Sequence, residues 1–140
     1  MVHSVHPLPH MPTLFVAHYG HPQLKGAKHW ALLLPKGDGV NIATAYQVTG
    51  STTTYEVKAP EDVRADNRNC MGTVEVGRIE ESRRKEFERV VLSVPVTRGI
   101  ITWNCQNWVI DALAALKANG FAVKTYTLLE LQEFLGKTSR

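Results

Sequence analysis

Two side chains in this 140-residue chain have the chemistry and setting of a nucleophile and its base: Cys105 and His29. Cys105 lies in the segment Thr-Trp-Asn-Cys-Gln-Asn-Trp-Val, where the longest predicted helix begins. The unpaired amides and the dipole of a helix N-terminus stabilise negative charge, so this position favours thiolate over thiol. Backbone N–H groups there can also hold a developing oxyanion, which makes Asn104 and Gln106 candidate oxyanion or site-adjacent residues. The alternative is a buried, inert thiol, a common state of cysteine in proteins.

A thiolate nucleophile usually works with an imidazole that holds the ion pair and later protonates the leaving group. His29 is the best candidate, because it opens an apolar segment in which a polar ring is unexpected unless it has a partner. A third group would orient the imidazole through its other ring nitrogen. Gln47 on the next predicted strand can lie beside His29 in an antiparallel pair, and Asn41 is its competitor. A half-exposed histidine at a strand edge and surface roles for both amides are the structural alternatives.

No metal or cofactor is predicted. The five other histidines lie near the N-terminus, at His3, His6, His10, His18 and His21. The first three lack cysteine or carboxylate partners at the spacing of metal ligands. Cys70 has no predicted helix start and no histidine beside it, so it is interpreted as structural. The chain has no phosphate-binding glycine loop, no GxSxG motif and no HExxH motif.

The hydrophobic pattern indicates which strands would position these residues. Strands are predicted over residues 13–19, 29–34 and 72–79. The segment 29–34 is continuously apolar up to Pro35, which is typical of a central strand buried on both faces. Residues 40–48 and 52–57 are rich in Thr, Tyr and Val and predict a β-hairpin. The charged stretch 59–69, which contains a proline, predicts a loop.

Helices are predicted in the second half of the chain, over residues 82–92, 105–119 and 128–135, with a last short strand over 121–126. Asn104 can cap the start of the long helix, and Gly120 can end it. Strands come first and helices follow. This order predicts an α+β fold with a mostly antiparallel sheet packed against helices.

Composition is that of an ordinary soluble domain, because 44% of residues are hydrophobic and 21% are charged. We expect an irregular N-terminal arm over residues 1–12 and a single domain over residues 13–140. The net charge of +3 comes from scattered residues, so no nucleic-acid partner is expected. Two cysteines do not form a disulfide framework, and neither a signal peptide nor a membrane-spanning run is found. These observations favour a cytoplasmic protein and leave the oligomeric state open.

Two stretches resemble the signatures of a known superfamily: His29-Trp30-Ala followed by three leucines, and Asn104-Cys105-Gln-Asn-Trp-Val. They are similar to those of the papain-like, circularly permuted NlpC-type and lecithin:retinol acyltransferase-like proteins. In that group the histidine strand precedes the cysteine helix, as in this chain. Residues 13–120 also resemble a small fungal family of unknown function. The resemblance implies a papain-like fold with Cys105 as nucleophile, His29 as base and Gln47 at the third position.

Gln47 departs from the superfamily pattern, in which the third position is often a histidine. A neutral amide orients an imidazole but stabilises imidazolium less than a charge would. The lipid-processing members carry a C-terminal membrane anchor, and residues 127–136 are too short and polar to replace it. We therefore expect a thiol hydrolase or acyl transferase that acts on an amide, peptide or ester in a small-molecule or peptide substrate. The alternative is a non-catalytic binding or effector module on the same scaffold.

Overall fold

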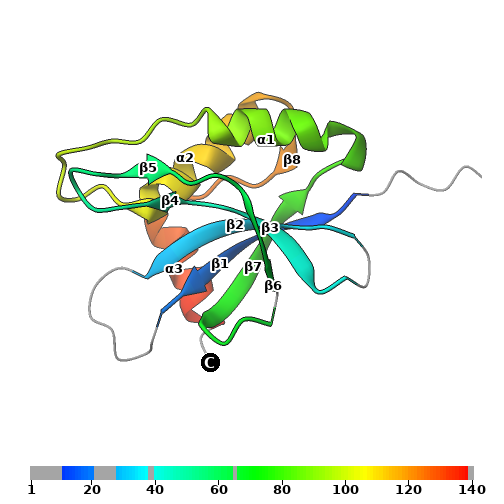
Figure 1. Cartoon of the computed structure of the whole chain (residues 1–140), viewed down its shortest axis with the longest axis horizontal. Coiled ribbons are helices and arrows are strands. Elements are labelled where there is room, and N and C mark those ends of the chain that lie inside the picture. Colours follow the sequence, from blue (N-terminus) through cyan, green and yellow to red (C-terminus); the bar gives the residue numbers. More distant parts are fainter. Residues whose placement is uncertain (1–10, 21–27, 38–39, 65, 139–140) are drawn as a thin grey trace, which may run out of the picture.

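The computed structural model describes residues 11–20, 28–37, 40–64 and 66–138. The predicted arm over residues 1–12 therefore lies almost entirely outside the described residues, and so does most of the loop after the first strand. The described chain combines a six-stranded sheet, a two-stranded ladder and three α-helices (Figure 1). Each described strand pair is antiparallel, which confirms the predicted α+β class.

The strands of the large sheet lie in the order β6-β3-β2-β1-β7-β8. Their bounds are β1 Thr13–Tyr19, β2 His29–Pro35, β3 Ile42–Tyr46, β6 Glu61–Arg64, β7 Cys70–Arg78 and β8 Ala122–Val123. The central pair aligns Tyr19 with His29 and Phe15 with Leu33. Five consecutive residues of β2 are buried, because both faces of this strand are covered, as its apolar run predicts.

Two sequence predictions about the strands need correction. The stretch 59–69 is not a loop throughout, because β6 pairs with β3 along the edge of the sheet. Its residues alternate between partly buried and exposed, and Pro60 stands just before the strand, where a missing N–H breaks no ladder bond. The predicted hairpin is much shorter than expected. Only β4 (Val48–Thr49) pairs with β5 (Glu56–Val57), while β3 belongs to the large sheet.

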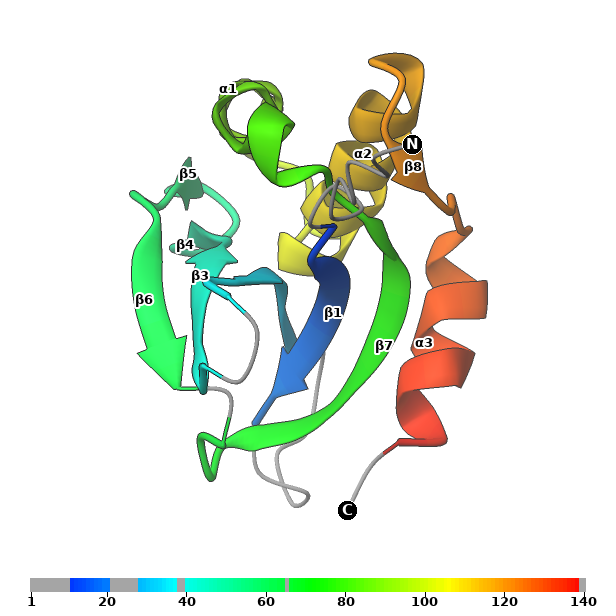
Figure 2. The same ribbon diagram turned by 90° about the vertical axis from the view of Figure 1, so that its right-hand side faces the viewer.

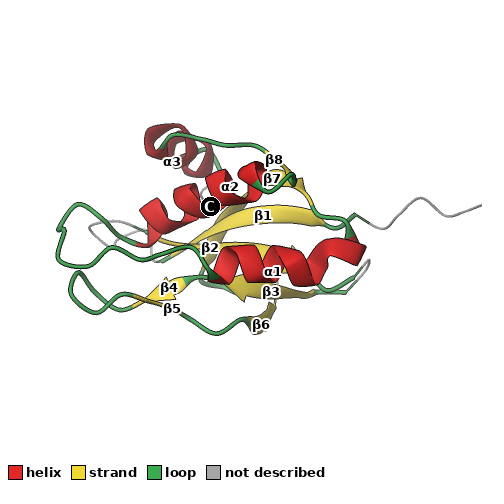
Figure 3. Ribbon diagram, turned by 90° about the horizontal axis from the view of Figure 1, so that it is seen from above, coloured by secondary structure: helices red, strands yellow, loops and turns green. Residues whose placement is uncertain are grey.

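Helices α1 (Arg84–Leu92) and α2 (Cys105–Ala118) lie together over one face of the sheet, as Figure 3 shows from above. Helix α3 (Leu128–Gly136) runs beside β7 at the sheet edge (Figure 2). The predicted cap of α2 is confirmed, because the Asn104 side chain accepts a hydrogen bond from the Gln106 amide. The Asn107 side chain accepts from the Asn104 amide in return, which completes a capping box.

The two faces of the sheet carry different side chains. Between the sheet and α1 and α2 lies a core of large side chains, including Leu14, Trp30, Leu32, Phe87, Trp108 and Leu113. The opposite face carries mostly small side chains: Ala17, Ala31, Leu33, Ala43, Ala45 and Cys70. Because successive strand residues alternate between faces, His29 starts β2 on the same face as Ala31, while Trp30 packs beneath α2.

His18 on β1 makes the stability of this fold depend on pH. Its side chain is 3% exposed, and its Nε2 lies 3.4 Å from the hydroxyl of Thr138. Burial, and then the charge of Lys28, lowers the pKa of His18 from 6.5. Above this value the ring is neutral in both the folded and the unfolded chain. Below it the unfolded chain takes up a proton that the folded chain resists, so stability falls with pH until the lower folded pKa is reached.

We therefore expect the free energy of unfolding to decrease as the pH falls from 6.5, and to decrease less in His18→Gln. Urea unfolding of both proteins between about pH 5 and pH 8 measures this difference. The His18→Gln protein retains the contributions of all other titrating groups, so the difference between the two curves reports His18 alone. Parallel curves for the two proteins would contradict the assignment.

Candidate functional site

Cys105 is the first residue of α2 and is partly buried. Its Sγ–H donates to the Lys28 carbonyl oxygen at 3.8 Å, and the Gln106 side-chain amide donates to the same oxygen at 2.9 Å. These two contacts hold the start of α2 against the residue that precedes β2. The site therefore lies at the end of the molecule where β4 and β5 also pack (Figure 1).

The sulfur of Cys105 is surrounded by backbone N–H groups, but burial has the larger effect on its ionisation. Burial raises the pKa of the Cys105 thiol, whereas the amides of Trp30, Cys105 and Gln106 lower it by a smaller amount. The net shift is upward, because little solvent reaches the sulfur to stabilise a charge. The helix start alone favours a thiolate, whereas in the folded protein the burial of the sulfur outweighs these amides and favours the thiol.

Both residues that the sequence predicts at the oxyanion site, Asn104 and Gln106, have backbone N–H groups that already donate to side chains. The Gln106 N–H donates to the side chain of Asn104 at 2.9 Å, and the Asn104 N–H donates to that of Asn107 at 3.0 Å. Among the described residues, the Cys105 N–H faces no acceptor besides its own sulfur. The Gln106 side chain is buried between Lys28 and Gln132, so it fixes the position of α2 and does not line the cavity beside Cys105.

His29 is held by Gln47, as the sequence predicts. The Nε2 atom of the imidazole is hydrogen-bonded to the side-chain oxygen of Gln47. The Gln47 amide nitrogen donates to Glu61 Oε1 at 2.9 Å, and Lys58 Nζ donates to the same oxygen at 2.8 Å. Asn41, the competing candidate, is exposed and interacts with Asp66 instead.

Sequence reasoning missed both Glu61 and Lys58. Glu61 belongs to the stretch 59–69 interpreted as a loop, and Lys58 lies between this stretch and the predicted hairpin. The approach of Glu61 to Gln47 depends on the pairing of β6 with β3. The only local signal is an opposite-charge pair three residues apart on either side of a proline. Such pairs are common on protein surfaces, so this signal does not single out a functional site.

Cys105 and His29 line the same cavity, which has a volume of about 480 Å³. Its remaining walls are formed by Val48, Thr49, Gly50, Tyr55, Ile101 and Asn104. No hydrogen bond joins the Cys105 sulfur to the His29 ring, although both side chains are described: the sulfur faces Lys28 and the ring Nε2 faces Gln47. His29 also lines a second cavity, of about 220 Å³, together with Ala31 and Ala45. The imidazole is therefore accessible from two cavities.

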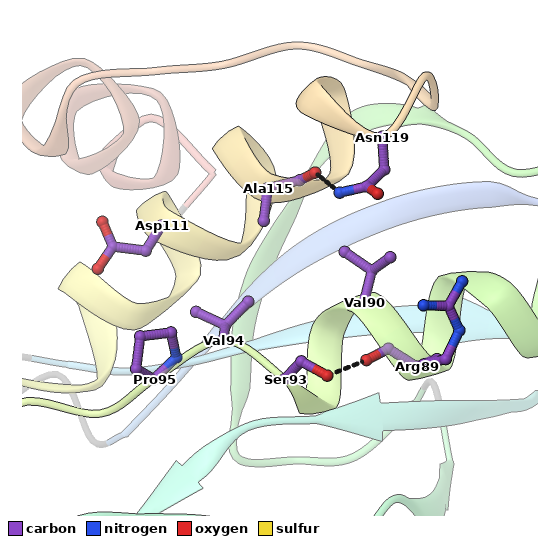
Figure 4. Close-up of a pocket in the computed structure, with 8 residues that line it drawn as sticks. All are labelled: Arg89, Val90, Ser93, Val94, Pro95, Asp111, Ala115 and Asn119. Carbon is purple, nitrogen blue, oxygen red and sulfur yellow. Dashed lines mark hydrogen bonds between the residues drawn. The ribbon is translucent and has the colours of Figure 1, made fainter.

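A third cavity, of about 390 Å³, lies between α1 and α2, away from both residues (Figure 4). Valines form its middle, with Arg89 and Asp111 at opposite ends. The side chains of Ser93 and Asn119 bond to backbone carbonyls of their own helices, at 2.7 and 2.8 Å. Its lining contains neither cysteine nor histidine, so this cavity is no candidate for thiol chemistry.

Within the described ranges, no three His, Cys, Asp or Glu side chains are grouped so that they could hold a metal ion. The histidines at positions 3, 6 and 10 lie outside the described residues. No described helix combines the length and the apolar character needed to cross a bilayer.

Fold and site together define a small α+β protein with a cysteine at a helix start and an amide-held histidine on the neighbouring strand. Residues 15–122 match the model of a family of unknown function, DUF6540, so the chain belongs to this family. The matched range contains Cys105, His29, Gln47 and Glu61 and ends before α3. No curated protein and no solved structure matches the chain.

Proposed function

We propose that the chain is a cysteine-dependent hydrolase or acyl transferase with a papain-like arrangement of the circularly permuted NlpC type. Cys105 would be the nucleophile, His29 its base and Gln47 the group that orients the base. The observation that carries the proposal is that the Cys105 thiol and the His29 imidazole line the same cavity. The imidazole is hydrogen-bonded to Gln47 through Nε2, so Gln47 fixes its orientation. A carbonyl substrate could reach both side chains there.

The hydrogen bond to Gln47 determines which ring nitrogen acts as the base. A side-chain amide oxygen only accepts hydrogen bonds, so the His29 Nε2 must carry the proton. In the neutral ring the lone pair is then on Nδ1. For attack, the Cys105 sulfur leaves the Lys28 carbonyl and transfers its proton to Nδ1 as the sulfur–carbon bond forms. This sequence needs no preformed thiolate, in keeping with the raised pKa of Cys105.

The later steps use the same two elements. The Cys105 N–H at the helix start stabilises the oxyanion of the tetrahedral intermediate. The protonated imidazole gives its proton to the leaving group, which produces a thioester on Cys105. His29 then deprotonates water, for hydrolysis, or another nucleophile, for acyl transfer. Gln47 carries no charge, so it stabilises the imidazolium less than a carboxylate would, and we expect turnover to be slow.

Acylation by p-nitrophenyl acetate tests this function, because the activated ester needs no specific recognition. We expect mass spectrometry to find an acetyl group on Cys105 and none on Cys70. The Cys70 sulfur is buried, and it donates to the Gly72 carbonyl at 3.6 Å, away from the shared cavity. Cys105→Ser should lose the adduct and Cys70→Ser should retain it. Equal acetylation of both cysteines, or none on Cys105, would sink the enzyme proposal.

A second candidate function is a binding module that uses the same cavity without turnover. It is favoured by the missing hydrogen bond between the Cys105 sulfur and the His29 ring and by the upward shift of the cysteine pKa. If the protein is a binding module, we expect Cys105→Ser to bind small molecules in the cavity of about 480 Å³ as well as the wild type does. Fragment binding, followed by NMR on both proteins, separates the two functions when combined with the acylation result.

A further inference from the structure

Four side chains form a continuous hydrogen-bonded chain from the protein surface to the shared cavity: Lys58, Glu61, Gln47 and His29. We propose that Glu61, held by Lys58, is a positioning residue that fixes the orientation of the Gln47 amide and thereby the tautomer of His29. The catalytic meaning of this inference rests on the proposed function, whereas the tautomer itself does not.

The amide of a glutamine side chain has an oxygen and a nitrogen of similar size at its end. A glutamine amide can present either its oxygen or its nitrogen to a neighbour, so Gln47 alone does not decide the state of the histidine. A carboxylate paired with a lysine accepts hydrogen bonds and donates none. Because Glu61 accepts from the Gln47 nitrogen at 2.9 Å, the Gln47 oxygen must face His29. The ring therefore presents N–H at Nε2 and a lone pair at Nδ1.

The backbone holds this arrangement in place. Glu61 is paired with Ala45 across β6 and β3, so it projects from the same sheet face as the residues around Gln47. The Lys58 backbone N–H donates to the Gln47 carbonyl at 2.9 Å, while its Nζ donates to Glu61 at 2.8 Å. Lys58 is therefore hydrogen-bonded both to Gln47 and to Glu61, the two residues whose side chains form the amide–carboxylate contact. Both side chains of the ion pair are about two-fifths exposed, so substitutions there need not disturb the core.

The neighbouring residue on β6 provides a matched control. Asp62 projects to the opposite side of the strand, where its carboxylate lies 3.1 Å from Lys36 Nζ in an exposed ion pair. Asp62→Asn therefore removes a carboxylate from the same edge strand without touching Gln47. Any effect of a lost surface charge or of a weakened edge strand should appear in this variant as well.

The decisive variant is the exchanged pair Lys58→Glu with Glu61→Lys. It keeps an ion pair but places a donor where Gln47 now meets an acceptor, so the amide should turn over and offer its nitrogen to the ring. We expect His29 to change from the Nε2–H to the Nδ1–H tautomer. Glu61→Gln retains an oxygen acceptor, which the Lys58 ammonium group, a donor only, keeps at the place where Gln47 also donates, so this variant should retain the Nε2–H tautomer. Glu61→Ala has no acceptor and should give a mixture of both tautomers, even if the exchanged pair fails to fold.

Long-range ¹H–¹⁵N NMR of protein labelled in its histidine rings distinguishes the two tautomers when the ring is neutral. The His29 signals are identified by their loss in His29→Gln. Tautomer change in the exchanged pair or in Glu61→Ala, with none in Asp62→Asn, supports the inference. It is overturned if His29 stays Nε2–H in every Glu61 variant, or if Asp62→Asn changes the tautomer as much.

Ester hydrolysis gives a separate readout. If the proposed function holds, kcat/KM should be roughly 10- to 100-fold lower in the exchanged pair than in the wild type, as when a residue that orients a functional histidine is removed. Glu61→Gln should keep most of the wild-type rate. A tautomer that changes as expected in a protein with no measurable hydrolysis in any variant would support the positioning role and reject the enzyme. If hydrolysis depends on His29 but the His29 tautomer is the same in every Glu61 variant, the enzyme is supported and the positioning role of Glu61 is rejected.

Discussion

Replacing His29 by alanine should lower kcat/KM for p-nitrophenyl acetate by roughly 10²- to 10⁴-fold, the range that a positioned general base contributes. The expected loss is large because burial raises the pKa of the Cys105 thiol, so little thiolate exists near neutral pH unless a base removes the proton. The release of nitrophenolate, followed at several pH values in both proteins, measures this contribution.

The pH dependence has a definite sign. Hydroxide replaces the missing base as the pH rises, so the rate of His29→Ala should increase towards the raised pKa of Cys105. The deficit relative to the wild type is then largest near neutral pH and shrinks in alkaline solution. His18→Gln is the control, because this second histidine is buried in β1 and does not line the cavity. If both histidine variants hydrolyse the ester like the wild type, the base is not a histidine of the described sheet.

The sequence predicts the centre of the fold well because burial there leaves a strong pattern. β1 and β2 are apolar runs that end at Gly20 and Pro35, and their bounds differ from the predicted ones by no more than one residue. β6 leaves almost no pattern, since it lies at a sheet edge and contains a single apolar residue, Val63. The pairing of β6 with β3 depends on the tertiary structure, which the local sequence does not reveal. The charged residues and the proline of this stretch, taken alone, therefore predict a loop.

The candidate site likewise has features that the sequence predicts and features that depend on the tertiary structure. Cys105, His29 and Gln47 could be identified because a helix start, a strand start and the next strand are local features of the sequence. The upward shift of the Cys105 pKa could not be predicted, because it is caused by burial, and residues far away in the chain, such as Tyr55, enclose the cavity that Cys105 lines. Glu61 was missed for the same reason as β6, since its contact with Gln47 exists only once the edge strand has paired.

Trp108→Ala should have the largest effect on stability, with a loss of roughly 3–5 kcal/mol in the free energy of unfolding. Trp108 lies one turn after Cys105 on α2 and is fully buried between this helix and the sheet. Its indole N–H also donates to the Val94 carbonyl at 3.2 Å, so truncation leaves both a cavity and a buried acceptor without its partner. Urea unfolding followed by far-UV circular dichroism measures the loss.

Trp103→Ala is the matched control, because it removes a tryptophan that is only partly buried, in the loop before α2, where its ring packs on Tyr55. We expect it to cost much less stability. Trp108→Phe should cost about 1–3 kcal/mol, because a smaller aromatic ring still fills part of the space but the buried Val94 carbonyl loses its hydrogen-bond donor. Equal losses for the two alanine variants would mean that α2 is not anchored through Trp108. If it is anchored there, Trp108→Phe should retain acetylation of Cys105, because the same helix holds the thiol beside the Lys28 carbonyl.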